Sequence, residues 1–199
     1  MSSDFSPWQQ RAYEHAVTAF DADRLGHGLL ICGPAGLGKR AVAERLAQYV
    51  LCTQKNSHQP CGKCRGCLLY LSRSQRENLE LRPDKSFSHP HGHPAHPDVV
   101  FVGHAWKMTP SPPRQLTQIV VDQMRVLSER LSKTPQYGDA LIAIIDPAEA
   151  MNENASNALL KTLEEPVAGR YLWLVSSQPA TLPATIRSRC QRLEFKLPP

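Results

Sequence analysis

The stretch GLLICGPAGLGKR, residues 28–40, decides the fold, because an apolar run leads directly into a glycine-rich loop. The run from Gly28 to Cys32 is typical of a strand that is buried on both faces of a parallel sheet. The loop after it has the spacing G-x-x-x-x-G-K, and helical periodicity begins at Lys39. A strand, a glycine-rich loop and a helix in this order predict a P-loop.

Five residues of this loop are the candidates for nucleotide binding: Gly33, Pro34, Gly36, Gly38 and Lys39. Glycines let backbone N–H groups turn toward phosphates, and the lysine ammonium reaches the terminal ones. The next residue is ordinarily Ser or Thr, whose hydroxyl binds Mg²⁺, but here it is Arg40, which has no acceptor atom. This degenerate P-loop leaves open whether ATP or ADP binds. Arg40 is expected to point to solvent from the first helical turn.

Further apolar runs alternate with helical patterns along the chain. Strands are predicted over residues 98–102, 140–146, 171–177 and 191–196, and helices over residues 7–20, 39–51, 119–131 and 147–163. This alternation predicts an α/β fold in which helices flank both faces of a parallel sheet. We expect residues 1–199 to form one nucleotide-binding-type domain, with a flexible Pro/His-rich insert at residues 74–97.

The predicted strand ALIAIID ends with Asp146, where P-loop ATPases carry the acid that helps to hold the metal ion. The next residue is Pro147 and not the acidic residue that activates water. Asp146, Pro147 and Glu149 also match the start of a helix with Asp146 as the N-cap, and this structural interpretation is favoured. Together with Arg40, this loss predicts that the chain does not hydrolyse ATP.

Four of the six cysteines form the pattern C-x8-C-x2-C-x2-C, at Cys52, Cys61, Cys64 and Cys67. Clustered thiols in a reducing compartment favour metal binding over disulfides. Four thiolates complete the tetrahedral shell of structural Zn²⁺ and leave no open position for catalysis. The spacing therefore predicts a small zinc-binding insertion at residues 52–67, with free cysteines or an iron–sulfur cluster as alternatives.

The formal charge of +5 and the pI of about 9.0 permit contact with nucleic acid but do not establish it. A zinc-dependent nucleic-acid-binding module is therefore one alternative function. No apolar run approaches the roughly 20 residues that span a bilayer, and the N-terminus lacks the pattern of a signal peptide. We expect a cytoplasmic protein without membrane contact.

Four features together resemble the AAA+ module of bacterial DNA polymerase III clamp loaders. They are the P-loop after GLLIC, the four-cysteine insertion after the P-loop helix, NASNALLKTLEEP at residues 154–166, and TIRSRC at residues 185–190. The resemblance covers nearly all of the chain except the Pro/His-rich stretch. The degenerate loop and the missing acidic pair imply a non-hydrolysing stator subunit, and an active ATPase of the gamma/tau type is the alternative.

The resemblance also implies roles and partners. Arg189 would be an arginine finger that acts in trans on the ATP of a neighbouring subunit, and its structural alternative is an exposed salt bridge near Glu194. Ser177 falls at the sensor position of the family. The implied partners are the gamma/tau and delta subunits, with the sliding clamp and primed DNA reached through the assembled complex. Family members continue into a helical lid and a collar, which we expect to be absent from this chain.

Overall fold

Five apolar segments of the sequence form one parallel sheet, with the strand order β2-β5-β6-β1-β7. The computed structural model describes residues 5–72, 96–104, 106–107, 112 and 114–196. The strands of this sheet are β1 (Gly28–Cys32), β2 (Val99–Val102), β5 (Leu141–Ile145), β6 (Arg170–Ser176) and β7 (Gln191–Glu194). Each lies within two residues of a predicted strand, so the α/β class with a parallel sheet is confirmed.

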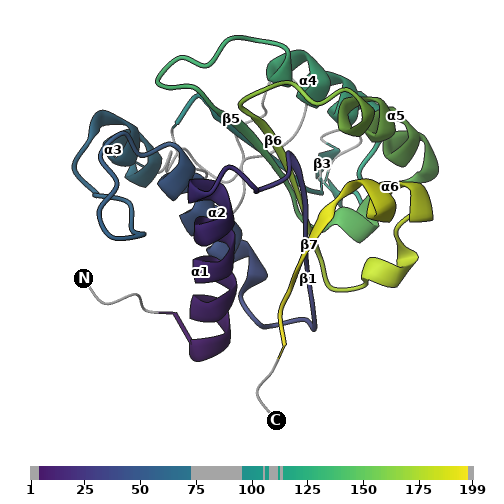
Figure 1. Ribbon diagram of the computed structural model, residues 1–199. Coiled ribbons are helices and arrows are strands. Elements are labelled where there is room, and N and C mark those ends of the chain that lie inside the picture. The colour runs from purple at the N-terminus through teal and green to yellow at the C-terminus, as the bar shows by residue number, and fades with distance from the viewer. Residues whose placement is uncertain (1–4, 73–95, 105, 108–111, 113, 197–199) are drawn as a thin grey trace.

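Helices cover both faces of this sheet (Figure 1). One face packs against α1 (Pro7–Asp21), α2 (Lys39–Val50) and α3 (Arg65–Leu71). The other packs against α4 (Val121–Leu131), α5 (Glu153–Glu164) and α6 (Ala184–Arg189). Two single-turn 3₁₀ helices, Ala148–Ala150 and Pro179–Thr181, connect strands to helices.

The central strand β1 shows why the apolar runs are continuous. Leu29 and Ile31 face the core formed with α1 and α2, whereas Leu30 and Cys32 face the core formed with α4 and α5. Because successive side chains of a strand point to opposite faces, a strand with helices on both sides needs apolar residues at every position. The five residues of β1 are accordingly all buried.

The segment after β5 differs from the prediction. Pro147 has an extended backbone, and α5 begins only at Glu153, where the Asn152 side chain accepts a hydrogen bond from the Ala155 N–H at 2.9 Å. The prediction of Asp146 as the N-cap of a helix that begins at Pro147 is therefore wrong. The cap of α5 lies six residues later, because the chain after Pro147 makes only the single 3₁₀ turn Ala148–Ala150 before Asn152.

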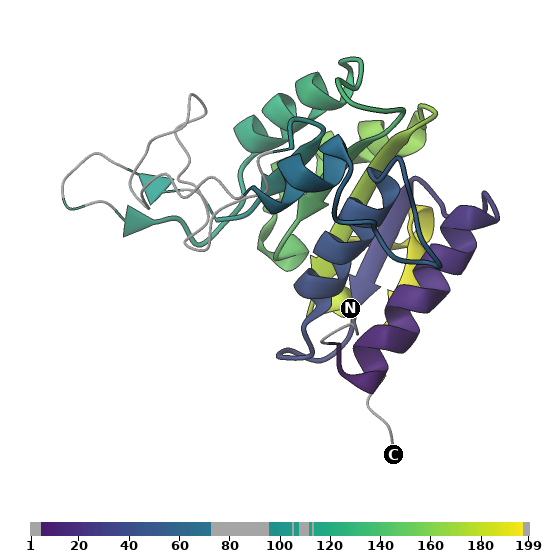
Figure 2. The same ribbon diagram turned by 90° about the vertical axis from the view of Figure 1, so that its left-hand side faces the viewer.

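The sequence patterns also missed short elements. These are α3, α6 and the hairpin of β3 (Trp106–Lys107) and β4 (Arg114–Gln115), which stands away from the main sheet (Figure 2). Residues 73–95, which hold most of the predicted Pro/His-rich insert, lie outside the described residues. None of the described helices has the length and apolarity needed to cross a membrane.

Candidate functional site

The glycine-rich loop, residues 33–38, joins the carboxyl end of β1 to the first turn of α2. Gly33 has a φ of 147°, and a Cβ atom there would lie 2.7 Å from the Phe195 carbonyl oxygen. Gly38 has a φ of 74°, and a Cβ atom there would collide with the Gln9 side chain. Both positions therefore favour glycine, Gly33 because the Phe195 backbone just after β7 lies so close and Gly38 because its positive φ strains other residues. The predicted strand–loop–helix unit is present.

Lys39 is folded back onto its own loop. Its Nζ donates hydrogen bonds to the carbonyl oxygens of Gly33 at 2.9 Å and Pro34 at 2.7 Å, and to Ser177 Oγ at 3.0 Å. An ammonium has three donors, so all of them are satisfied within the protein. Burial lowers the pKa of Lys39, and Glu149 and Asp146 oppose that shift. The side chain is only 5% exposed.

Ser177 connects this lysine to an acidic residue on the connection after β5. The Ser177 N–H donates to Glu149 Oε1 at 3.0 Å, while its hydroxyl accepts from Lys39. Glu149 Oε2 is buried and has no hydrogen-bond partner among the described residues. The carboxyl ends of β1, β5 and β6 meet at one edge of the sheet, which brings Lys39, Ser177 and Glu149 together. Sequence reasoning singled out Ser177 at the end of its strand but gave Glu149 only a capping role.

The sequence led us to expect that Arg40 points to solvent, but in the structure it does not. Its Nε lies 2.9 Å from Glu44 Oε1, its Nη1 lies 3.3 Å from Asp146 Oδ2, and its Cζ lies 5.0 Å from the centre of the Phe101 ring. Two carboxylates and a ring face hold the guanidinium more favourably than an exposed rotamer would. The side chain remains 23% exposed.

The pairing with Arg40 gives Asp146 an electrostatic role in place of the predicted capping role. Burial raises the pKa of Asp146, and the Arg40 guanidinium beside it opposes that rise. P-loop ATPases hold Mg²⁺ between an aspartate at this position and a hydroxyl after the loop lysine. Here a guanidinium, which cannot coordinate a cation, contacts the aspartate instead. The residues present therefore do not fit a magnesium ion.

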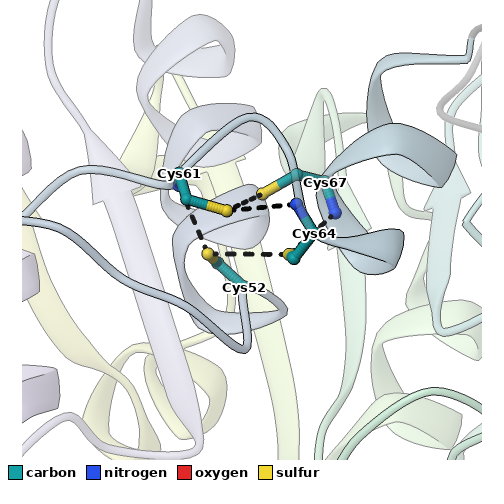
Figure 3. Close-up of side chains that lie close together, drawn as sticks. All are labelled: Cys52, Cys61, Cys64 and Cys67. Carbon is teal, nitrogen blue, oxygen red and sulfur yellow. Dashed lines mark hydrogen bonds between the residues drawn. The ribbon is translucent and has the colours of Figure 1, made fainter.

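The four predicted metal ligands lie together beside α2 and α3 (Figure 3). Cys52 follows the end of α2, Cys61 lies in the connecting loop, Cys64 is the N-cap of α3 and Cys67 lies in its first turn. All four sulfur atoms lie within 4.8 Å of one another, with Cys64–Cys52 at 3.8 Å and Cys61–Cys67 at 4.0 Å. These separations exclude disulfides.

The dimensions of this cluster fit a tetrahedral ion. Metal–sulfur bonds of about 2.3 Å place the corners of a tetrahedron about 3.8 Å apart, close to the separations found here. Backbone N–H groups of Cys61, Cys64 and Cys67 donate to the sulfurs of Cys52, Cys61 and Cys64 at 3.3, 3.2 and 3.4 Å. Such donors favour thiolates. The pKa of Cys61 is lowered because the N–H groups of Lys63 and Cys64 donate to its sulfur.

The last predicted site residue, Arg189, ends α6 and lies apart from the loop. Its Nη2 lies 2.7 Å from Glu164 Oε1 on α5, and its Nη1 donates to the Thr185 carbonyl at 3.0 Å. The salt bridge predicted as the structural alternative thus exists, but with Glu164, since Glu194 pairs with Lys196. Among the described residues, no contact of Arg189 involves the glycine-rich loop. It does not complete the chain's own nucleotide site.

A family model described as "DNA polymerase III, delta subunit" matches residues 8–199. DNA polymerase III subunit delta' of Pseudomonas aeruginosa is 35% identical over 196 residues, covering 98% of this chain and 50% of the relative. The delta' subunit of Escherichia coli is 33% identical over 193 residues, covering 97% and 49%. Subunit tau of Bacillus subtilis is 28% identical over 173 residues, covering 87% and 25%. This chain spans about half the length of the delta' relatives.

Among solved structures, a gamma subunit-related protein of Thermotoga maritima superimposes with a TM-score of 0.56. It is 19% identical in sequence, and the match covers 94% of this chain and 46% of the other. At this level of identity the similarity concerns the fold alone. It confirms the predicted fold class, in which a P-loop unit is built on a parallel sheet with flanking helices.

Proposed function

Because the chain belongs to the family described as DNA polymerase III, delta subunit, we propose that it is a non-hydrolysing, delta'-type stator subunit of a bacterial clamp loader. The observation that carries the proposal is the engagement of both loop cations, Lys39 and Arg40, by the protein's own acceptors. Over the aligned residues, the delta' subunits of Pseudomonas aeruginosa and Escherichia coli are 35% and 33% identical to this chain, against 28% for the tau subunit above, which supports the delta' type.

The site lacks the groups that hydrolysis needs. Attack of water on a γ-phosphoryl group requires a metal ion to neutralise charge and a residue to orient the water. Arg40 contacts the carboxylate of Asp146, the acid that would help to hold a metal ion, and Pro147 follows where a second acid would stand. Glu149 is directed to the Ser177 N–H instead. The loop residues Gly33, Pro34, Gly36, Gly38 and Lys39 would then serve as a scaffold, with nucleotide bound weakly or not at all.

Arg189 is the residue that would act on another subunit. A guanidinium supplied in trans stabilises the charge that develops on a transferring phosphoryl group. The Arg189 side chain is 37% exposed at the end of α6. Among the described residues it makes no contact with the glycine-rich loop of its own chain, which suits a role at a neighbour's site. In this role the subunit braces the ring and completes the ATP site of an adjacent gamma/tau subunit.

The cysteine cluster would hold one structural Zn²⁺, with Cys52, Cys61, Cys64 and Cys67 as its ligands. Zinc prefers four thiolates in a closed tetrahedral shell, and the sulfur separations support this assignment. The ion would fix residues 52–67 and the start of α3. The further partners of the proposal are the delta subunit, the sliding clamp and primed DNA, reached through the assembled complex in the cytoplasm.

One specific observation favours a second function, an active ATPase of the gamma/tau type. Gly38 and Lys39 are both retained, and Gly33, Gly36 and Gly38 all have positive φ angles. In that case a water molecule would have to replace the missing hydroxyl as a metal ligand.

Calorimetric titration of ATP into the chain, with and without Mg²⁺, separates the two functions when phosphate release is measured on the same sample. The proposal predicts no release, and either no binding or binding that Mg²⁺ does not change. Magnesium-dependent binding with steady release, abolished in the matched variant Lys39→Ala, would instead establish the ATPase.

A further inference from the structure

A guanidinium of the same chain contacts Asp146, the acid that directly follows β5. We propose that the Arg40 guanidinium is a resident cation that replaces the divalent metal ion, holding Asp146 and Glu44 and excluding Mg²⁺. This inference rests on the proposed non-hydrolysing function and gives it a structural cause.

The contacts of Arg40 resemble the coordination of an ion by acids from separate elements. Glu44 lies one turn further along α2, and Asp146 directly follows β5. Each carboxylate meets a different nitrogen of the guanidinium, Nε at 2.9 Å for Glu44 and Nη1 at 3.3 Å for Asp146. One positive charge thus joins α2 to the end of β5, a connection that a bound metal ion would otherwise make.

The surroundings hold the guanidinium in place. Phe101 on β2 lies 5.0 Å from Cζ, so its ring offers a cation–π contact to the guanidinium. The Nη2 atom is buried and has no hydrogen-bond partner among the described residues. Arg40 therefore retains a donor and has no acceptor at this point. An anionic oxygen could use that donor, whereas a cation would meet only repulsion.

A fixed guanidinium has a consequence that an exchangeable ion lacks. Mg²⁺ arrives with nucleotide and leaves with it, so an ordinary P-loop alternates between two electrostatic states. With Arg40 in place, Asp146 and Glu44 share one fixed positive charge at all times. The loop, the first turn of α2 and the end of β5 then keep one arrangement whatever nucleotide is present, as a stator requires.

The substitution Arg40→Thr tests this inference, because it restores the hydroxyl and removes the charge. Mn²⁺ is the probe, and its binding to the zinc-loaded chain is followed by electron paramagnetic resonance. We expect only nonspecific Mn²⁺ binding in the wild-type chain, and in Arg40→Thr one specific site whose affinity is about tenfold or more higher than that nonspecific binding. Mn²⁺ should also raise the melting temperature of this variant and leave that of the wild-type chain unchanged.

Matched variants identify the ligand. In Arg40→Thr combined with Asp146→Asn, the gained Mn²⁺ site should disappear, since the carboxylate is lost while the shape is kept. A folded Arg40→Thr variant without gain, or a double variant that binds as well, would overturn the inference. If Arg40→Thr does not fold, the wild-type chain still decides, because Mn²⁺ binding that Asp146→Asn abolishes would show that Arg40 excludes nothing. Phosphate release, which tests the proposed function, is measured separately.

Discussion

Arg189 and Glu164 form an ion pair, in which Nη2 of the arginine lies 2.7 Å from Oε1 of the glutamate. The pair joins the end of α6 to the end of α5, and both side chains are more than one third exposed. An exposed pair of this kind contributes little to stability. In the proposed trans role, the guanidinium would have to leave Glu164 before it could reach the ATP of a neighbouring subunit.

Replacing Arg189 with alanine should reduce the DNA-stimulated ATPase of a reconstituted full-length clamp loader by roughly 10³-fold or more, the range seen for arginine fingers elsewhere. The unfolding free energy of the isolated chain should change by less than about 1 kcal/mol, since the lost ion pair is exposed. Arg189→Lys should not restore the rate, because lysine lacks the planar fork. Arg192→Ala, which removes an exposed arginine on β7, is the matched control and should leave the ATPase rate unchanged. Wild-type rates in Arg189→Ala would refute the finger.

Replacing Glu164 with glutamine distinguishes two roles for this residue. Glu164 either only restrains the Arg189 guanidinium within its own chain, or it orients that guanidinium for the neighbouring subunit. If Glu164 only holds Arg189 back, Glu164→Gln frees the guanidinium, and the ATPase rate of the same complex should be equal to the wild-type rate or higher. The variant keeps the size of the side chain, so packing against α6 is preserved. A rate that falls as far as in Arg189→Ala would show instead that Glu164 orients the finger.

The cysteine cluster predicts one Zn²⁺ per chain, measured by elemental analysis of the purified protein. Cys64→Ser should lose the metal, because the N-cap of α3 would no longer supply a thiolate, whereas Cys190→Ser, a buried cysteine outside the cluster, should retain it. In Cys64→Ser, amide hydrogen exchange should be faster than in the wild-type chain in residues 52–67 and α3, and should stay slow in β1. Full zinc content in Cys64→Ser, or an equal loss in Cys190→Ser, would contradict the assignment.

The elements that the sequence predicted well are those whose local pattern and tertiary role agree. Every position of β1 is buried by helices on both sides, so its apolar run has one interpretation. The cysteine spacing likewise determines a compact cluster, because the four ligands lie within sixteen residues of one another. Long-range pairing has no such local signal. Arg40 and Asp146 are 106 positions apart, and no periodicity could reveal that one would point at the other.

The missed elements have physical reasons as well. Helices α3 and α6 contain seven and six residues, too few for a helical repeat to stand out. The start of α5 was misplaced because Asp146 and Pro147 form a plausible cap by themselves, while Asn152 supplies the real one. The pairing of Asp146 with Arg40 depends on the tertiary fold, which brings the residue after β5 to the first turn of α2.

Asp98 should be important for stability, although it has no role in the proposed site. Its carboxylate is buried before β2 and accepts hydrogen bonds from the backbone N–H groups of Gln136 at 2.8 Å and Tyr137 at 2.9 Å. Asp98→Ala should lower the unfolding free energy by about 2–3 kcal/mol in urea titrations, since it leaves two N–H groups unpaired. Asp122→Ala, at an exposed salt bridge, should have almost no effect. Equal changes in unfolding free energy in Asp98→Ala and Asp122→Ala would show that the hydrogen bonds from the backbone to Asp98 do not stabilise the fold.

His96 should make stability depend on pH below neutrality. Burial lowers the pKa of this imidazole from its usual 6.5, and Asp98 only partly opposes that shift. Its Nδ1 accepts from the Asp98 N–H at 3.2 Å, which favours the neutral ring. As the pH falls below about 6.5, the unfolded chain therefore binds a proton at His96 that the folded chain does not, and the unfolding free energy decreases.

The variant His96→Asn isolates this contribution, because an amide oxygen can replace Nδ1 as an acceptor and does not titrate. Urea unfolding of both proteins between neutral pH and about pH 5 should give a steeper decline for the wild-type chain. Zinc content has to be measured at each pH, since protonation of the thiolates would also release the metal and lower stability in both proteins. Parallel declines at equal zinc content would mean that His96 is protonated as readily in the folded chain as in the unfolded one.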